Sequence, residues 1–99
     1  MIWRIRELLS SQELIAEGRR MHHCVSSYAA SCHAGRCSIW SVDVETEDGA
    51  EALLTIEVGH DAKDIRQVRG LRNRVATEKE KEIIRRWALQ EKLGTELLR

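Results

Sequence analysis

The chain has 99 residues, of which 32% are charged and 42% hydrophobic, and its formal net charge is zero. This balance is typical of a soluble globular protein and excludes a disordered tail, and no apolar run approaches the roughly 20 residues of a membrane-spanning helix. A chain of this length fits one domain, which we expect to cover residues 1–99.

Two helices are predicted in the first third of the chain. Ser10, with Glu13 three residues later, is a capping-box pattern that predicts a short helix, interrupted at Gly18. Apolar residues then recur at spacings of three and four over residues 21–34, and Gly35 follows where a left-handed helix cap is expected. These residues predict a second helix over 21–34.

Three strands are predicted next. From Cys37 to Glu45 polar and apolar residues alternate, which predicts a half-buried strand with one face towards solvent. The Glu47-Asp48-Gly49 sequence is typical of a tight turn, so residues 52–58 should form the second strand of a hairpin. Residues 65–69 alternate as well and predict a third strand.

The last predicted element is an amphipathic helix. Thr77 and Glu80 form a second capping box, and an apolar stripe that includes Ile84 and Trp87 follows it. The expected fold is therefore a two-layer α+β domain, with a three-stranded antiparallel meander, two N-terminal helices and one C-terminal amphipathic helix.

Histidine and cysteine gather in one short segment of the chain. Three cysteines so close together do not form the framework of a disulfide-rich fold, which indicates a reducing, cytoplasmic setting. The segment between residues 22 and 37 holds three of the four histidines and all three cysteines: His22, His23, Cys24, Cys32, His33 and Cys37.

Three interpretations of this cluster remain open. A zinc site is poorly matched, because Cys24 and Cys32 would lie about 12 Å apart along one helix, and we assign neither a metal nor a cofactor. Cys24 can instead act as a nucleophile near a helix N-terminus, with His23 beside it and the amides of Gln67 and Asn73 holding a substrate. The third interpretation is structural, with Cys24 in the core and His23 hydrogen-bonded to Gln67 or Asn73.

The ordered set of motifs resembles the PcfJ-like family. The residues that carry the resemblance are Glu17-Gly18, His23-Cys24-Val25, Tyr28, Gly35 before a strand, and Gln67-x-x-Gly70-x-x-Asn73. The resemblance implies an association with conjugative plasmids and other mobile genetic elements, as an accessory to DNA transfer, and it implies no established catalytic activity. The matching residues that look functional are His23, Cys24, Gln67, Arg69 and Asn73.

Basic residues concentrate after the predicted hairpin. Residues 63–74 carry five basic side chains against one acidic side chain, and this pattern predicts contact with nucleic acid phosphates. The alternative is an exposed face on which Glu78, Glu80 and Glu82 pair with the basic residues of the last helix. The arginines proposed to bind nucleic acid are Arg66, Arg69, Arg72, Arg74, Arg85 and Arg86.

The function predicted from these patterns is an accessory, nucleic-acid-associated module of a DNA-processing or mobile-element assembly. Its partners would be nucleic acid and either proteins of that assembly or a second copy docked through the acidic hairpin, with no membrane partner. The alternative is a small enzyme centred on His23 and Cys24, with Gln67 and Asn73 in support.

Overall fold

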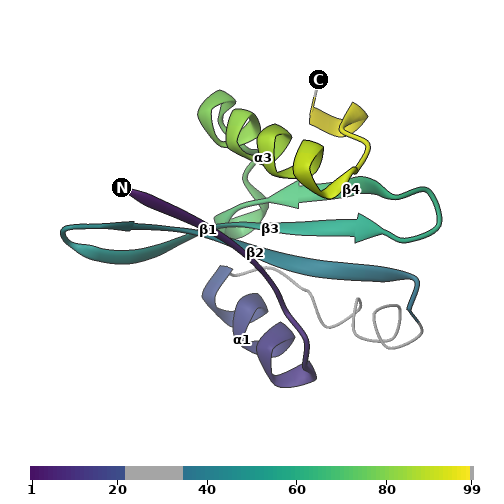
Figure 1. The fold of residues 1–99 in the computed structure, drawn as a ribbon. Coiled ribbons are helices and arrows are strands. Elements are labelled where there is room, and N and C mark those ends of the chain that lie inside the picture. Colours follow the sequence, from purple (N-terminus) through teal and green to yellow (C-terminus); the bar gives the residue numbers. More distant parts are fainter. Residues whose placement is uncertain (22–34, 99) are drawn as a thin grey trace.

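The computed structural model describes residues 1–21 and 35–98 of the chain (Figure 1). The helix predicted over residues 21–34 lies almost entirely outside the described residues. The described elements are, in chain order, β1 (Ile2–Glu7), α1 (Ser11–Met21), β2 (Cys37–Thr46), β3 (Gly49–Gly59), β4 (Asp64–Arg69), the 3-10 helix η1 (Leu71–Asn73), α3 (Glu78–Glu91) and the 3-10 helix η2 (Glu96–Leu98).

The strands form one antiparallel sheet in the order β1-β2-β3-β4. The α+β class is confirmed, but the expected three strands are wrong, because β1 pairs with β2 from Ile2↔Glu45 to Glu7↔Trp40. Exposed and partly buried positions alternate over residues 2–7, and Trp3 and Ile5 are on the partly buried side, as in an edge strand with one face on the core.

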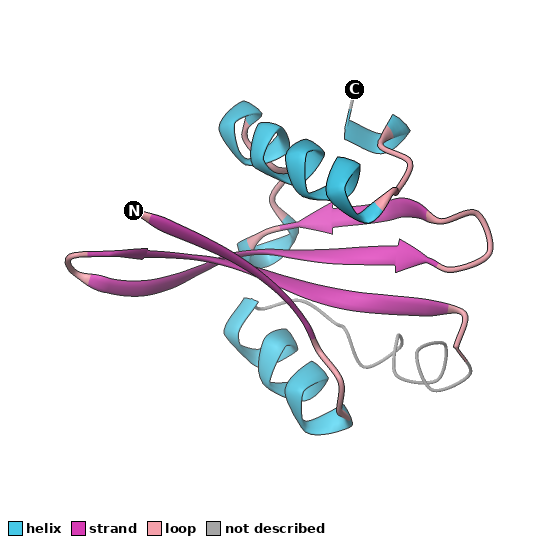
Figure 2. Ribbon diagram, viewed as in Figure 1, coloured by secondary structure: helices cyan, strands magenta, loops and turns pink. Residues whose placement is uncertain are grey.

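The helices cover both faces of the sheet. Figure 2 shows α1 on one side of the four strands and α3 on the other. The expected two-layer arrangement is therefore wrong: the face of β2 that was predicted to meet solvent contains Ile39 and Ser41, which are 0% and 4% exposed. Burial of this second face requires polar side chains on it to find partners inside the protein.

The main core lies between the sheet and α3. Leu54 and Ile56 from β3 and Ile84 and Ala88 from α3 have no exposed surface, so this interface excludes water completely. At its edge the rings of Trp40 and Trp87 meet edge to face, with centroids 5.0 Å apart and an interplanar angle of 62°. Such a geometry places the positive edge of one ring against the negative face of the other.

The predicted capping box at Thr77 is complete, and Ser10 caps the first helix while the Glu13 carboxylate accepts a hydrogen bond from the Leu9 backbone N–H at 3.0 Å. The backbone N–H of Glu13 donates to the Ser10 hydroxyl at 3.1 Å, and that of Glu80 donates to the Thr77 hydroxyl at 3.2 Å. The Glu80 carboxylate in turn accepts from the Thr77 backbone N–H at 2.9 Å. The first helix nevertheless continues through Gly18 to Met21 and is not interrupted there.

The hairpin forms where it was predicted. The strand register shifts once within this hairpin and once between β3 and β4. The β2–β3 connection closes at Gly49, whose φ of 113° is readily adopted only by glycine. Leu53 and Arg66 each stand as one extra residue in their strand pair, next to the register shifts after Val42 and Glu57. Bulges of this kind redirect side chains, and the second one lies in the arginine-rich segment.

Candidate functional site

A carboxylate is buried between α1 and the sheet. Glu17 of α1 has 0% exposure. It accepts a hydrogen bond from the Thr55 hydroxyl of β3 at 2.6 Å and one from the Ser41 hydroxyl of β2 at 3.2 Å. The guanidinium of Arg20, one turn further along α1, forms an ion pair with the same carboxylate. Because every one of these partners is a donor, the site is built for an ionised or hydrogen-bond-accepting group.

The sequence positions Glu17 there through helical spacing. The buried residues of α1 are Leu14, Glu17 and Met21, at spacings of three and four, so the acid lies within the stripe that packs on the sheet. Ser41 and Thr55 are direct cross-strand partners, which places their two hydroxyls next to each other under α1. The three side chains together dock the helix by polar contacts in an otherwise apolar interface.

The same face of the sheet carries part of the predicted site. Thr55 pairs with Arg69, and Glu57 pairs with Gln67, so these positions lie on the face covered by α1. The helix also packs against η1, the segment that ends at Asn73. The structure thus brings α1 close to the segment from Gln67 to Asn73. His23 and Cys24, which follow α1 directly in the chain, lie outside the described residues.

Glu57 is a carboxyl group on this face whose pKa is raised. Desolvation by burial raises the pKa of Glu57, and the positive charge of Arg66 offsets only part of that effect. Arg66 itself is exposed and forms an ion pair with Asp61. A raised pKa moves a carboxyl group in the direction that general acid–base chemistry requires.

Two arginines of the basic segment have no acidic partner within residues 1–21 and 35–98. Arg69 donates to the backbone carbonyl of Val68 at 3.0 Å, and neither it nor Arg72 forms an ion pair there. Arg72 is exposed and has a φ of 55°, in the left-handed region that side chains disfavour. These two side chains are the open positive charges at the end of β4 and in η1.

The other four predicted arginines contact acceptors of the protein itself, Arg66 through its ion pair with Asp61. Arg74 makes two 2.9 Å hydrogen bonds to the Glu80 carboxylate and a 3.3 Å bond to the Leu53 carbonyl. Arg85 donates to the Leu98 carbonyl, and Arg86 pairs with Glu82 at 2.8 Å. The guanidinium of Arg74 therefore ties the η1 segment to the first turn of α3.

A small cavity of about 120 Å³ lies beside Arg69. Lys81 of α3 brings a second cation to it, while the remaining lining residues are apolar. A volume of this size accommodates an ionic group but not a nucleoside or a cofactor. Its lining residues are Val68, Arg69, Val75, Ala76, Lys81, Leu97 and Leu98.

Among the described residues, no group of three or more histidine, cysteine, aspartate or glutamate side chains could hold a metal ion. Cys37, from the predicted cluster, is the first residue of β2 and is buried. In the same described part of the chain, no helix is both long enough and apolar enough to cross a membrane.

The family model described as PcfJ-like protein matches residues 2–84. The chain belongs to the PcfJ-like family. The match extends from β1 into α3, so it contains Glu17 with both of its hydroxyl donors and the whole segment from Gln67 to Asn73. Searches among curated proteins and among solved structures found no significant match.

Sequence reasoning named Glu17 within this PcfJ-like pattern but gave it no role, and it missed Ser41 and Thr55. The signal for Glu17 was present, because an acid three residues after Leu14 and four before Met21 belongs to a buried helical stripe. The two hydroxyl residues gave no such signal, since Ser and Thr are common on exposed strand faces.

Proposed function

We propose that this PcfJ-like chain is an accessory module that binds nucleic acid through the basic edge formed by Arg66, Arg69 and Arg72. The observation that carries the proposal is the absence of an acidic partner for Arg69 and Arg72 among the described residues, at an edge strand and the turn that follows it. Unpaired guanidinium groups on consecutive elements can bind phosphates without first breaking an internal ion pair.

Besides Arg66, four further cations support this edge. Arg66 stands on a bulge, and its partner Asp61 is 76% exposed, so their ion pair is solvated and weak enough to exchange for a phosphate. Lys81 adds charge beside Arg69, and its ion-pair partner Glu78 is 84% exposed. Arg85 and Arg86 extend the positive field along α3, and Arg74 adds its charge while bound to Glu80.

The cellular role that we propose is an accessory function within a DNA-processing or mobile-element assembly. Membership of the PcfJ-like family supports this role. Contacts through phosphates are tolerant of sequence, so the module would position other proteins on nucleic acid without selecting a site. Its protein partners would then be other members of the assembly, or a second copy of the chain.

The test compares two double variants in nucleic acid binding over a range of salt concentrations. Arg69→Ala with Arg72→Ala removes the two unpaired charges, and Arg4→Ala with Arg19→Ala removes two exposed charges elsewhere. If each arginine of the first pair contacts one phosphate of a duplex, the slope of log K against log salt falls by about 1.8. Fluorescence anisotropy with a labelled duplex measures this slope.

The control pair should leave the slope almost unchanged, because its charges lie on β1 and on the outer side of α1. Equal losses in the two double variants would indicate that only net charge matters. An intact protein that shows no salt-sensitive retention of DNA would contradict the proposal directly.

A small enzyme centred on His23 and Cys24 is the second candidate function. The observation that favours it is the packing of α1 against η1, because α1 leads directly into His23-Cys24 and η1 ends at Asn73. Gln67 lies on the same sheet face, paired with Glu57, whose carboxyl group has a raised pKa. The test uses the variants Cys24→Ser and His23→Ala. If they stay folded and lose turnover of a nucleotide or acyl substrate, this function is established. If they only have a lower melting temperature, it is rejected.

A further inference from the structure

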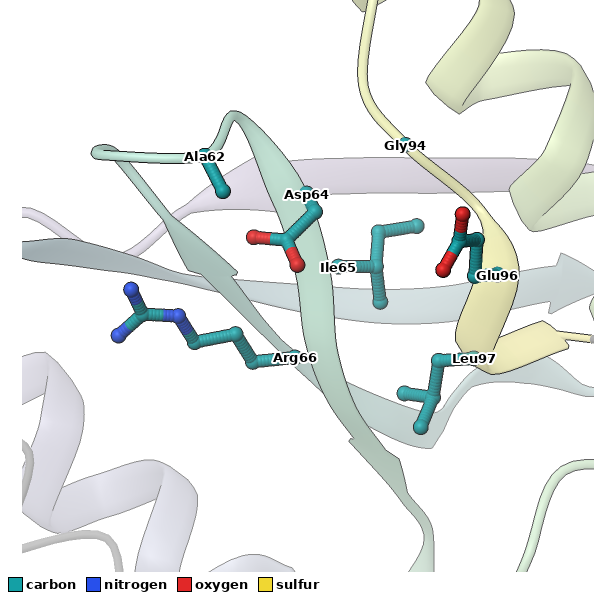
Figure 3. A pocket seen from close by; sticks show the side chains of 7 residues that line it. All are labelled: Ala62, Asp64, Ile65, Arg66, Gly94, Glu96 and Leu97. Atoms are coloured by element: carbon teal, nitrogen blue, oxygen red, sulfur yellow. The ribbon is translucent and has the colours of Figure 1, made fainter.

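A second, larger cavity lies at the open edge of β4. Its volume is about 700 Å³, which is in the range of small-molecule sites. The cavity forms because the C-terminal segment pairs with β4 only at its start, where the Ile65 N–H donates to the Gly94 carbonyl at 3.0 Å, and then diverges into η2. Its lining residues are Ala62, Asp64, Ile65, Arg66, Gly94, Glu96 and Leu97 (Figure 3).

One oxygen atom in this lining lacks a partner. Asp64 Oδ1 has less than 1 Å² of exposed surface and makes no hydrogen bond within the described part of the chain. Nearly all buried polar atoms in folded proteins have a hydrogen-bond partner, so a buried acceptor without one calls for a donor from beyond the described residues. The strongest donor for a carboxylate oxygen is a cationic N–H group.

The neighbouring charges do not supply that donor. Arg66 is the closest cation in the lining, but Figure 3 shows its guanidinium directed away from Glu96 and Leu97, and it is paired with Asp61. Figure 3 also shows the Glu96 carboxylate directed from η2 towards β4, on the other side of Ile65 from Asp64. The cavity therefore has a carboxylate on each of two walls.

The remaining surface of the cavity is apolar. Ile65 is 3% exposed and forms its floor, and the Leu97 side chain points from η2 towards β4 (Figure 3). Ala62 contributes a methyl group from the turn before β4. A ligand that fits both parts of this lining has a positive end and a short aliphatic stem, which is how lysine and arginine side chains cross apolar surface.

We infer that this cavity binds a primary ammonium or guanidinium group carried on an aliphatic stem. The positive group donates hydrogen bonds to Asp64 Oδ1 and to the Glu96 carboxylate, and the stem lies on Ile65 and Leu97. Two sources share this chemistry: a free polyamine and the basic side chain of a protein partner. Arg66 of the basic edge lines the cavity, but the inference does not depend on nucleic acid binding, because the proposed contacts to the cation come from Asp64 and Glu96.

The test is an amide NMR titration of the whole chain with n-butylammonium, which contains only the proposed charge and stem. We expect saturable shifts at the Ile65, Gly94 and Leu97 amides. Asp64→Asn and Glu96→Gln should each weaken binding about tenfold, because each removes one charge-assisted contact. Glu47→Gln removes one exposed acid at the hairpin turn, at the opposite end of β3, and should leave the affinity unchanged.

Two further titrations identify the source of the cation. Tighter binding of spermidine than of a blocked lysine peptide indicates a polyamine site, and the reverse order indicates a protein partner. The inference is overturned if n-butylammonium gives no saturable shift at these amides, or if Glu47→Gln weakens binding as much as the two cavity variants. Glu96 is exposed in η2, so its variant keeps the test decisive even if Asp64→Asn disturbs folding.

Discussion

Thr55 donates a 2.6 Å hydrogen bond to Glu17, and this contact joins the central strand β3 to α1 at a carboxylate that water does not reach. A buried carboxylate is tolerated only when donors replace the water it has lost. The Thr55 hydroxyl, the Ser41 hydroxyl and the Arg20 guanidinium are those donors. The position of α1 on the sheet therefore depends on a small polar cluster as well as on apolar packing.

Replacement of Thr55 by valine should destabilise the fold. The change keeps the shape of the side chain but removes a hydrogen bond to a charged group, which typically costs about 1.5–3 kcal/mol. Thr55→Ser is the matched control, because it keeps the hydroxyl and loses only a methyl group. Urea denaturation of the three proteins measures the difference, and equal stability of the valine and serine variants would show that the hydroxyl contributes nothing.

The Arg74–Glu80 pair should make stability depend on pH in the acid range. Burial alone would raise the pKa of Glu80, but hydrogen bonds from Arg74 and from the Thr77 backbone outweigh it and lower the pKa. A lowered folded-state pKa means that the stabilisation is complete above the ordinary glutamate pKa and is lost as the pH falls through the folded value. Glu80→Gln should therefore flatten the acid limb of the stability curve.

The measurement is the free energy of unfolding between about pH 3 and pH 7. Glu78→Gln serves as the control, because Glu78 is the first residue of the same helix and its side chain is 84% exposed. Breaking the Arg74–Glu80 contact should cost about 1–3 kcal/mol at neutral pH, because Glu80 is 5% exposed and would lose its main cation. An unchanged acid limb in Glu80→Gln would refute this account.

The contribution of Glu57 to the free energy of unfolding should depend on pH in the opposite direction. Its pKa is raised by desolvation, so the folded protein binds the proton more tightly than the unfolded chain does. The relative stabilisation is fully present below the ordinary glutamate pKa and is lost as the pH rises through the folded value. Glu57→Gln is therefore expected to stabilise the protein at neutral pH and to change it little in acid, which the same unfolding series detects. A neutral-pH loss of stability would mean that Arg66 dominates over desolvation.

The Trp40–Trp87 contact should couple the sheet to α3. Edge-to-face aromatic pairs contribute about 0.5–1.5 kcal/mol beyond the area that they bury. A double-mutant cycle with Trp40→Leu and Trp87→Leu should recover a coupling of this size, because the two rings are 5.0 Å apart. In the comparison cycle, Ile15→Ala with Trp87→Leu should be additive to within about 0.5 kcal/mol, because Ile15 is 47% exposed on α1, on the other side of the sheet from α3 (Figure 2).

Elements with a strong local signal were predictable from the sequence. The helix caps at Ser10 and Thr77 and the turn before Gly49 depend on residues close together in the chain, and the structure contains all three. The buried alternation of β3 and the stripe of α3 were predictable for the same reason. Local hydrogen bonding and hydrophobic period decide these features almost alone.

The features that were missed depend on contacts between distant segments. Residues 2–7 alternate as a strand does, yet only pairing with β2 shows that they form an edge of the sheet. The polar residues of β2 read as a solvent-facing side because nothing local indicates that α1 covers them. The bulge at Arg66 likewise arises from pairing with β3 and shifts the register of the basic segment.

For the candidate site, the sequence predicted which segments are involved but not which side chains contact one another. The expected meeting of the His23–Cys24 helix with Gln67 and Asn73 lies outside the described residues, whereas α1, which precedes that segment in the chain, packs on β3 and η1. The hydrogen-bond partners of Glu17 could not be predicted, because the hydroxyls of Ser41 and Thr55 come from different strands and meet the helix only in the folded protein. The roles of Gln67 and Asn73 remain predictions.

The backbone of Arg72 separates two properties that usually change together. At a φ of 55° a side chain crowds its own carbonyl, whereas glycine adopts this conformation without a steric penalty. Arg72→Gly should therefore relieve local strain while deleting one positive charge from the basic edge. The variant should therefore have a higher melting temperature and a lower affinity for nucleic acid. The arginine at this position supplies a positive charge at the cost of backbone strain.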